Sequence, residues 1–197
     1  GFVTATDQLT FYKTVNGGVN WTSSNTGIAS VKLNSVSFDN ASTGTVVGNN
    51  GAIYKTVDGG ASWVSQVSGT TRNLLKLKYF SGNLIAVGEY GTLLKNTGSG
   101  WTSIDSKIKT DIRGITGTSF SDVHLCGGGG FIRNNKSGSD NFTKFEENPM
   151  MANLVDIFYY DANNGWAVSS LNSVIIYTAN AGASWSMPAG ATMTKSW

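Results

Sequence analysis

Short apolar segments separated by Gly, Asn, Ser and Thr run along the whole chain. The clearest set occupies residues 154–159, 165–168, 174–177 and 184–185. Apolar segments this short, with turn residues between them, are typical of β-strands rather than of helices. We therefore expect four strands in this stretch and an all-β fold for the chain.

The same set of segments returns about every 40 residues. The first segment recurs at residues 33–38, 74–79 and 112–117, the second at 45–48, 85–88 and 125–127, and the third at 10–13, 52–55, 92–95 and 131–133. The aromatic residues that end the units are Trp21, Trp63, Trp101, Phe142 and Trp185, spaced by 42, 38, 41 and 43 residues. Four strands in about 40 residues is the period of a propeller blade. The pattern predicts a single domain over residues 1–197, a five-bladed β-propeller of four-stranded blades.

A turn motif precedes each of these aromatic residues, and its best copy is residues 56–63, Thr-Val-Asp-Gly-Gly-Ala-Ser-Trp. Asp58 is expected to accept hydrogen bonds from the N–H groups of the two glycines, and Gly59 and Gly60 allow positive φ values. Trp63 supplies a large apolar ring just beyond the turn. The motif is therefore predicted to form the tip of a hairpin between two strands.

The copies of the motif differ from one unit to the next. Asparagine replaces the aspartate at positions 16 and 180, the third copy (residues 96–101) is one residue short, and the fourth (residues 134–142) has lost the tryptophan. Because the copies differ in sequence and length, we expect them to stabilise hairpins rather than to bind a ligand. This structural role is predicted for Asn16, Trp21, Asp58, Gly60, Trp63, Trp101, Asn180 and Trp185.

The turn motif resembles the Asp-box of sialidases and related propellers. The full unit, seen best at residues 154–185, resembles the repeat of photosystem II assembly factors and their bacterial relatives, the Ycf48-like or BNR group. The resemblance covers essentially the whole chain and implies a propeller. It implies little about function, because the repeat occurs in proteins with different tasks. The photosystem relatives carry more blades and an arginine-rich patch, whereas this chain has few arginines.

The two ends of the repeat have to meet, because an open ring leaves unpaired strand edges. The first unit begins at residues 2–6, which match a second strand, so its innermost strand is missing. Residues 191–197 are the candidate for this strand, and they would reach it by a short turn at residues 188–190. The alternative is that other residues or neighbouring subunits complete the ring.

Composition excludes several classes of partner. Charged residues make up 13% of the chain and the formal net charge is +2, against roughly 25% charged residues in most soluble proteins. Lys and Arg are scattered, so no patch would attract nucleic acid or an anionic membrane. No apolar run is long enough to insert into a membrane. Such a neutral, polar surface is common outside the cell, and we expect an extracellular, cell-surface or virion location, the leader being absent from this sequence.

Catalysis, metals and cofactors have little support. A sialidase would need three arginines around a sugar carboxylate, but Arg133 falls in the position that lysines fill in other units. Another glycoside hydrolase would need two opposed carboxylates, for which Asp111 and Asp156 remain candidates. His124 and Cys126 share one strand face, but two ligands do not make a metal site. We expect both of them to pack inside the fold, and we expect no enzyme, metal or cofactor.

Surface recognition remains as the predicted function. In propellers, the loops from second to third strand and those between blades gather on one face around the central channel. The residues predicted to bind there are Asp7, Gln8, Asn49, Asn50, Arg72, Glu89, Tyr90, Arg113 and Asn172. We predict a non-catalytic interaction module that binds a protein or a glycan on this face. The alternatives are a glycan-binding or sialidase-like propeller and a self-assembling subunit of a filament, surface layer or virion.

Overall fold

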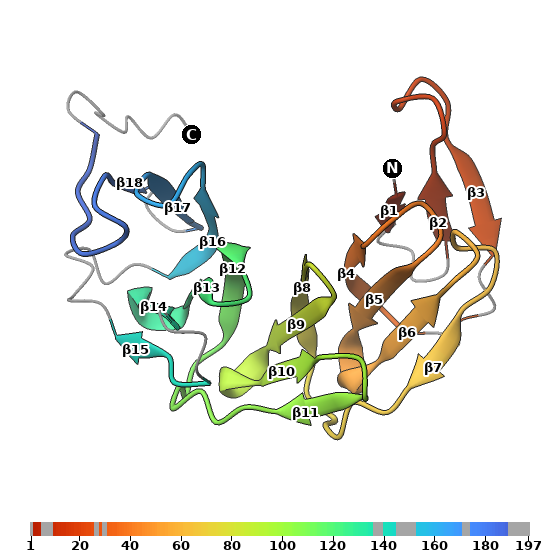
Figure 1. Cartoon of the computed structure of the whole chain (residues 1–197), viewed down its shortest axis with the longest axis horizontal. Helices are drawn as coiled ribbons and strands as arrows, with labels where there is room; N and C mark the ends of the chain where they lie inside the picture. The colour runs from red at the N-terminus through yellow and green to blue at the C-terminus, as the bar shows by residue number, and fades with distance from the viewer. Residues whose placement is uncertain are drawn as a thin grey trace. The chain divides into compact units, whose positions relative to one another are not determined.

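The computed structural model describes residues 2–4, 10–25, 28, 31–135, 140–144, 153–170 and 174–188. These residues form β-strands joined by turns and three short 3-10 helices (Figure 1). The all-β prediction is confirmed. Within the described ranges, no helix has the length and apolar character needed to cross a bilayer.

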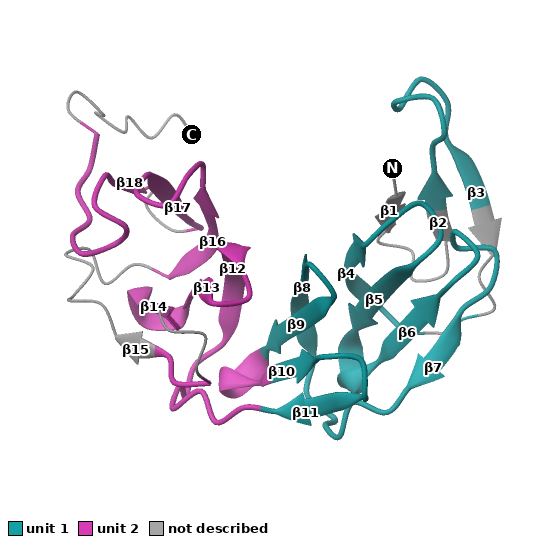
Figure 2. Cartoon of the chain, viewed as in Figure 1, with its two compact units in different colours: residues 1–88, 94–103 teal, residues 89–93, 104–197 magenta. Residues whose placement is uncertain are grey.

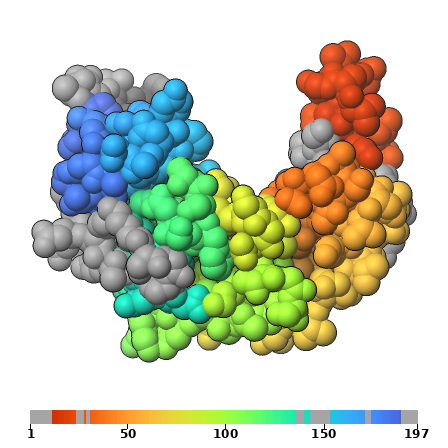
Figure 3. Space-filling model, viewed as in Figure 1, coloured from red at the N-terminus to blue at the C-terminus, as the bar shows by residue number. Residues whose placement is uncertain are grey.

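The described strands form five antiparallel sheets, and each sheet comes from one continuous stretch of chain. In the space-filling view, residues that are close in sequence accordingly stay together in bands of one colour (Figure 3). Sheet A contains β1 (Phe2–Thr4), β2 (Thr10–Lys13) and β3 (Thr22–Asn25); sheet B contains β4 (Leu33–Phe38), β5 (Gly44–Gly48), β6 (Ile53–Thr56) and β7 (Val64–Gln66). Sheet C contains β8 (Leu74–Phe80), β9 (Asn83–Gly88), β10 (Leu93–Asn96) and β11 (Trp101–Ser103); sheet D contains β12 (Ile112–Ser119), β13 (Asp122–Gly127), β14 (Ile132–Asn134) and β15 (Thr143–Lys144). Sheet E contains β16 (Leu154–Tyr159), β17 (Gly165–Ser169) and β18 (Ile175–Thr178), and the 3-10 helices are η1 (Asn49–Gly51), η2 (Glu89–Gly91) and η3 (Gly128–Gly130).

The chain divides into two compact units (Figure 2). Residues 1–88 with 94–103 form the first, which holds sheets A and B and nearly all of sheet C. Residues 89–93 with 104–197 form the second, which holds sheets D and E. The prediction of a single domain over residues 1–197 stays a prediction.

Within the first unit, the first strands of sheets B and C lie side by side. The N–H of Leu77 in β8 donates to the Ser35 hydroxyl of β4 at 3.1 Å. Val47, Ile53 and Leu84 belong to the apolar cluster of these two sheets. The second strands β5, β9 and β13 are buried on both faces, and this double burial explains why they read as continuous apolar runs in the sequence.

Within the second unit, sheets D and E pack through stacked rings. The imidazole of His124 in β13 lies on the ring of Tyr159 in β16, with centroids 4.0 Å apart and planes inclined by 25°. The imidazole Nε2 lies 3.0 Å from Asp122 Oδ1. Burial, and then the charge of Asp122, raises the pKa of Tyr159 well above its usual range. His124 and Cys126 are both fully buried, so the prediction that they pack inside the fold is confirmed.

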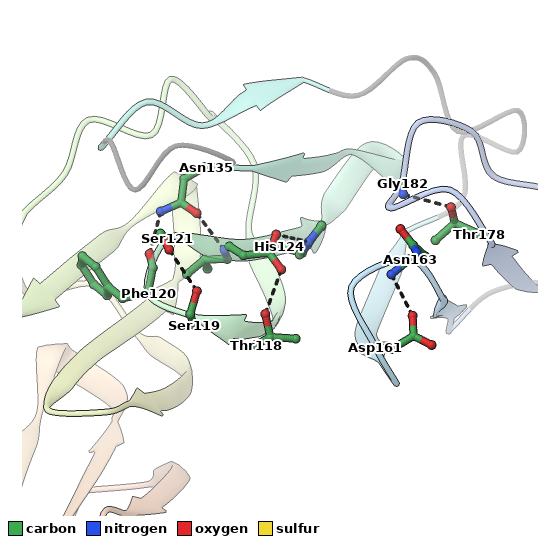
Figure 4. Close-up of polar contacts among 12 residues, drawn as sticks. Thr118, Ser119, Phe120, Ser121, His124, Asn135, Asp161, Asn163, Thr178 and Gly182 are labelled. Carbon is green, nitrogen blue, oxygen red and sulfur yellow. Dashed lines mark hydrogen bonds and ion pairs between the residues drawn. The ribbon is translucent and has the colours of Figure 1, made fainter.

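Asn135 shows how a buried amide closes a hairpin in the same unit. Its Oδ1 accepts from the N–H of Val123 at 2.7 Å, and its Nδ2 donates to the Phe120 carbonyl at 3.1 Å (Figure 4). The β12–β13 turn is thereby tied to the strand that follows it, with no polar group of this amide left without a partner.

The turn motif is organised by a buried threonine. Thr56 Oγ1 donates to Asp58 Oδ1 at 2.8 Å and accepts from the N–H groups of Asp58, at 3.3 Å, and Gly60, at 2.9 Å. The same hydrogen bonds join Thr14 to Asn16 and Gly18, and Thr178 to Asn180 and Gly182. Figure 4 shows the contact between Thr178 and Gly182. The motif connects β6 to β7, which are paired antiparallel, so the predicted hairpin tip is confirmed.

The prediction that Asp58 accepts hydrogen bonds from the two glycines is wrong. The N–H of Gly60 goes to the threonine, and that of Gly59 goes to the Ser42 carbonyl at 2.8 Å. The Asp58 carboxylate accepts from the hydroxyl of Ser62 at 2.5 Å and from its N–H at 2.9 Å. These hydrogen bonds, led by that of the Ser62 hydroxyl, hold the pKa of Asp58 well below its usual range.

The aromatic rings of the motif differ in burial. Trp63 packs edge-on against Phe38 of β4, and Trp185 packs edge-on against Tyr159 of β16, with centroids 6.1 Å apart in both pairs. Trp185 is 7% exposed, whereas Trp21 is 43% exposed. The partner rings lie on the first strand of their sheets, and the described part of sheet A contains no such strand. Of the other two rings, Phe142 is buried and Trp101 is half-buried.

Sheet A also bears on the predicted closure of the ring. Its β1 pairs with β2 as β5 pairs with β6, so it corresponds to a second strand, as expected from the sequence. Residues 191–197, the predicted inner strand of this sheet, lie outside the described residues.

Candidate docking face

Three turns connect the second strand to the third in sheets B, C and D, and they share one backbone conformation. In η1, η2 and η3 the middle residue has a left-handed backbone, with φ of 56° at Asn50, 51° at Tyr90 and 76° at Gly129. A residue other than glycine adopts this backbone conformation only where its surroundings stabilise it.

A polar side chain just before the next sheet holds each turn. The hydrogen bonds run from Asn50 N to Asn73 Oδ1 (2.9 Å), from Tyr90 N to Asp111 Oδ1 (3.2 Å) and from Gly129 N to Asn153 Oδ1 (2.8 Å). Each acceptor comes directly before the first strand of the following sheet, β8, β12 or β16. One repeated contact therefore fixes these loops to the entry of the next sheet, in each case within one compact unit.

These turns also have a packing role. A Cβ atom at Gly91 would lie 1.8 Å from the carbonyl oxygen of Ile108, and one at Gly51 would lie 1.9 Å from that of Thr70. The signal for this role is present in the sequence as Gly-x-x-Gly at residues 48–51, 88–91 and 127–130. An Asn or Asp then stands immediately before each following strand.

In the second unit, Asp111 brings two predicted binding residues together. Its Oδ1 accepts the Tyr90 N–H, and its Oδ2 lies 3.2 Å from Arg113 Nη2. Tyr90 is 65% exposed, and the side chains of Arg113 and Asp111 are each about one-third exposed. The carbonyl of Glu89 closes the turn by accepting from the N–H of Thr92 at 3.0 Å and from its hydroxyl at 2.6 Å.

In the first unit, a second group of predicted residues surrounds Asn73. Asn50 is exposed and bonded to Asn73 through its N–H, and Arg72 is the exposed neighbour of Asn73 in the chain. Asn49 is half-buried, and its Oδ1 accepts from Asn34 Nδ2 at 2.9 Å. The predicted residues thus form one group in each unit. Asp7, Gln8 and Asn172 lie outside the described residues.

The residues considered for catalysis have structural partners. The Arg133 guanidinium donates from Nη1 to the carbonyls of Ser106, at 3.3 Å, and Phe142, at 3.4 Å. Asp156 Oδ1 accepts the N–H of Ile157 at 3.1 Å, and Asp111 holds the turn described above. Among the residues that the structure describes, no group of three His, Cys, Asp or Glu side chains could hold a metal ion.

Comparison with protein families shows to which family the repeat belongs. The profile of a family described as photosynthesis system II assembly factor YCF48 matches residues 40–196. The chain belongs to this family. The resemblance to the Ycf48-like repeat that its turn motif and strands indicate is confirmed. No curated protein matches the chain.

Solved structures show that the YCF48-like chain has the propeller fold. It is similar to a structure of YCF48 bound to D1 peptide, at 17% identity and a TM-score of 0.69 over 91% of this chain and 60% of that one. It is also similar to the WD40 β-propeller domain of Doa1, at 14% identity and a TM-score of 0.72 over 89% of this chain and 60% of that one. An ancestral GH74 enzyme matches at 14% identity and a TM-score of 0.75, over 95% of this chain and 29% of that one. At these identities the likeness shows the fold alone.

The comparisons also bear on location and length. The prediction of an extracellular, cell-surface or virion location is wrong, because the family is described by its part in the assembly of photosystem II. A neutral surface is compatible with many surroundings, so composition could not decide this. The chain spans about 60% of the YCF48 structure with which it was compared.

Proposed function

We propose that this protein is a non-catalytic β-propeller that binds a segment of a partner protein. The observation that carries the proposal is the family match over residues 40–196 to an assembly factor. A structurally similar YCF48 is bound to D1 peptide. The GH74 neighbour shows that the same fold also serves enzymes, so the fold by itself does not decide between binding and catalysis.

The docking face is proposed from the exposed residues of the turns. Tyrosine and arginine are the residue types that most often dominate interface energetics. Tyr90 and Arg113 are held by Asp111, so less side-chain and loop entropy is lost when a partner binds. The proposed face comprises Asn49, Asn50, Arg72, Glu89, Tyr90 and Arg113, together with Asp7, Gln8 and Asn172.

Tyr90→Ala tests this face against a labelled D1 peptide in a fluorescence anisotropy titration. We expect the wild-type chain to bind and the variant to bind roughly 30-fold more weakly, since truncating a central aromatic contact costs about 2 kcal/mol. The matched control is Tyr160→Ala, another exposed tyrosine of the second unit, which follows β16 and is remote in sequence from the turns. Its affinity should equal that of the wild type.

Two results would contradict the proposal at different levels. Equal affinities of wild type and Tyr90→Ala would remove Tyr90 from the docking face and leave a protein-binding function. Absence of binding to the D1 peptide at millimolar concentration would overturn the proposal that this protein binds a peptide segment as YCF48 does.

The five sheets are proposed to be five blades of a ring closed within one chain, with residues 191–197 as the inner strand of sheet A. Sheet E supports this closure. Phe158 of β16 is 59% exposed, whereas Thr116, which has the same place in β12 of sheet D, is 3% exposed. Trp166 pairs with Phe158 and is exposed as well, so an aromatic sheet face is left to be covered.

Light scattering and thermal melting test this closure. We expect the mass of one chain and a melting temperature that does not depend on concentration, because the covering sheet then comes from the same molecule. Deleting residues 191–197 should lower the melting temperature. A dimer or larger assembly, or a melting temperature that rises with concentration, would show instead that neighbouring chains cover the face.

A further inference from the structure

A hollow of about 140 Å³ lies between sheets B and C, inside the first unit. Sheet B contributes Thr45, Lys55 and Gln66, and sheet C contributes Tyr79, Leu84 and Trp101. Thr43 and Asn96 also line it, as do three glycines of the adjacent turns. None of these residues belongs to the docking face proposed above.

The equivalent place between sheets D and E is filled by the ring of His124. Sheet B has a threonine at that position, and this difference in side-chain size explains the hollow. Thr45 lies opposite Ser37, the fifth residue of β4, as His124 lies opposite Thr116, the fifth residue of β12. Between sheets D and E the His124 imidazole stacks on Tyr159. Thr45 is much smaller than histidine, so the corresponding volume beside Tyr79 is left open.

Two further differences distinguish this place from its equivalent between sheets D and E. Tyr159 is paired with Gly165, and its ring lies against that glycine, because a Cβ there would be 2.8 Å from the ring. Tyr79 is paired instead with Leu84, which stands where sheet E has that glycine. The turn that carries Trp101 is also one residue shorter than the other copies.

The hollow has two aromatic walls and a polar rim. Tyr79 and Trp101 are half-buried and pack against the apolar cluster of sheets B and C. Burial, then the charge of Asp39 and a hydrogen bond to it, raises the pKa of Tyr79. Lys55 has no carboxylate partner among the described residues. Gln66 adds a side-chain amide to the rim.

The volume and the lining define the ligand. An apolar cavity of about 150 Å³ holds one benzene, so this hollow has room for one six-membered ring. An aromatic side chain would use the two rings of the hollow but would offer no hydrogen-bonding group to the ammonium and amides of its rim. A pyranose offers a C–H face to the aromatic walls and hydroxyls to the amides, and a carboxylate on it would meet Lys55.

We propose that this hollow is a binding site for a single acidic pyranose residue, a uronic acid, of a glycan. The ring lies against Tyr79 and Trp101, its carboxylate pairs with Lys55, and its hydroxyls bond to Gln66 and Asn96. The site is separate from the proposed protein-docking face, so either can fail without the other.

Saturation-transfer NMR with methyl glucuronide, methyl glucoside and N-acetyltyrosinamide tests the proposal. We expect the wild-type chain to bind the glucuronide with millimolar affinity, at least about tenfold more tightly than the neutral glucoside. Because Lys55 is exposed, this preference should shrink as salt is added. Tighter binding of the tyrosine derivative than of either sugar would overturn the proposal in favour of a peptide side chain.

Three variants locate the binding. Thr45→His places in sheet B the residue that sheet D has there, fills the hollow and should abolish binding while the thermal melt stays cooperative. Lys55→Met should reduce the affinity for the glucuronide to that for the glucoside. Lys95 has the position in sheet C that corresponds to Lys55, but it lies outside the lining of the hollow. Lys95→Met should therefore leave the affinities for the glucuronide and for the glucoside unchanged. Undiminished glucuronide binding by a folded Thr45→His variant, or by Lys55→Met, would refute the site.

Discussion

Replacing Trp185 with alanine should lower the free energy of unfolding by about 3–5 kcal/mol, the usual cost of removing a large buried aromatic side chain. The indole is nearly buried in the apolar cluster of sheets D and E, edge-on to Tyr159. Its Nε1 is buried with no hydrogen-bond partner among the described residues, so the truncation breaks no hydrogen bond. The expected loss therefore comes from apolar burial and from the cavity that is left. Urea denaturation followed by circular dichroism would measure it.

Trp21→Ala is the matched control because it removes the same side chain from the same position of the turn motif. Trp21 is exposed and has no first-strand ring to pack against in the described part of sheet A. We expect this variant to lose about 1 kcal/mol or less, as is usual for surface substitutions. Equal losses for the two variants would contradict the view that packing against Tyr159 gives the motif its stabilising role.

Gly91→Ala should destabilise the second unit by about 3 kcal/mol or more. Gly91 has φ of 72°, which costs an alanine about 1–2 kcal/mol. The added Cβ would also lie 1.8 Å from the carbonyl oxygen of Ile108, so the backbone of the segment after β11 has to move. Such overpacking costs about 1–3 kcal/mol more. Chemical denaturation would measure the loss, and hydrogen exchange at residues 104–111 would show whether it is local.

Gly129→Ala separates the two contributions. Gly129 has φ of 76°, close to that of Gly91, but a Cβ there would meet no atom within 4 Å. We expect it to lose only the backbone part, about 1–2 kcal/mol. If Gly91→Ala were no worse than Gly129→Ala, the close approach to Ile108 would not be a constraint on the fold.

The candidate docking face stays a prediction. Tyr90, Arg113, Asn50 and Arg72 were selected because of their residue types and their place between strands. What holds them was not recognised, because Asp111 and Asn73 act on turns about 20 residues earlier in the chain. A carboxylate or amide just before an apolar strand has many possible roles, and only the folded chain shows which donor it meets.

The sequence by itself determined the repeat, the turns and most of the strands, because these depend on short-range patterns of apolar, turn-forming and glycine residues. The fourth strand expected at the end of sheet E is only an isolated bridge between Tyr177 and Ser186 in the described residues. It also carried the match to the YCF48 family. The tertiary structure alone decided that a threonine, not the aspartate or asparagine of the motif, receives the N–H of Gly18, Gly60 and Gly182. It also decided that Tyr90 and Arg113 share Asp111. It alone revealed the hollow beside Tyr79, because an empty volume depends on the sizes of side chains that meet from different sheets.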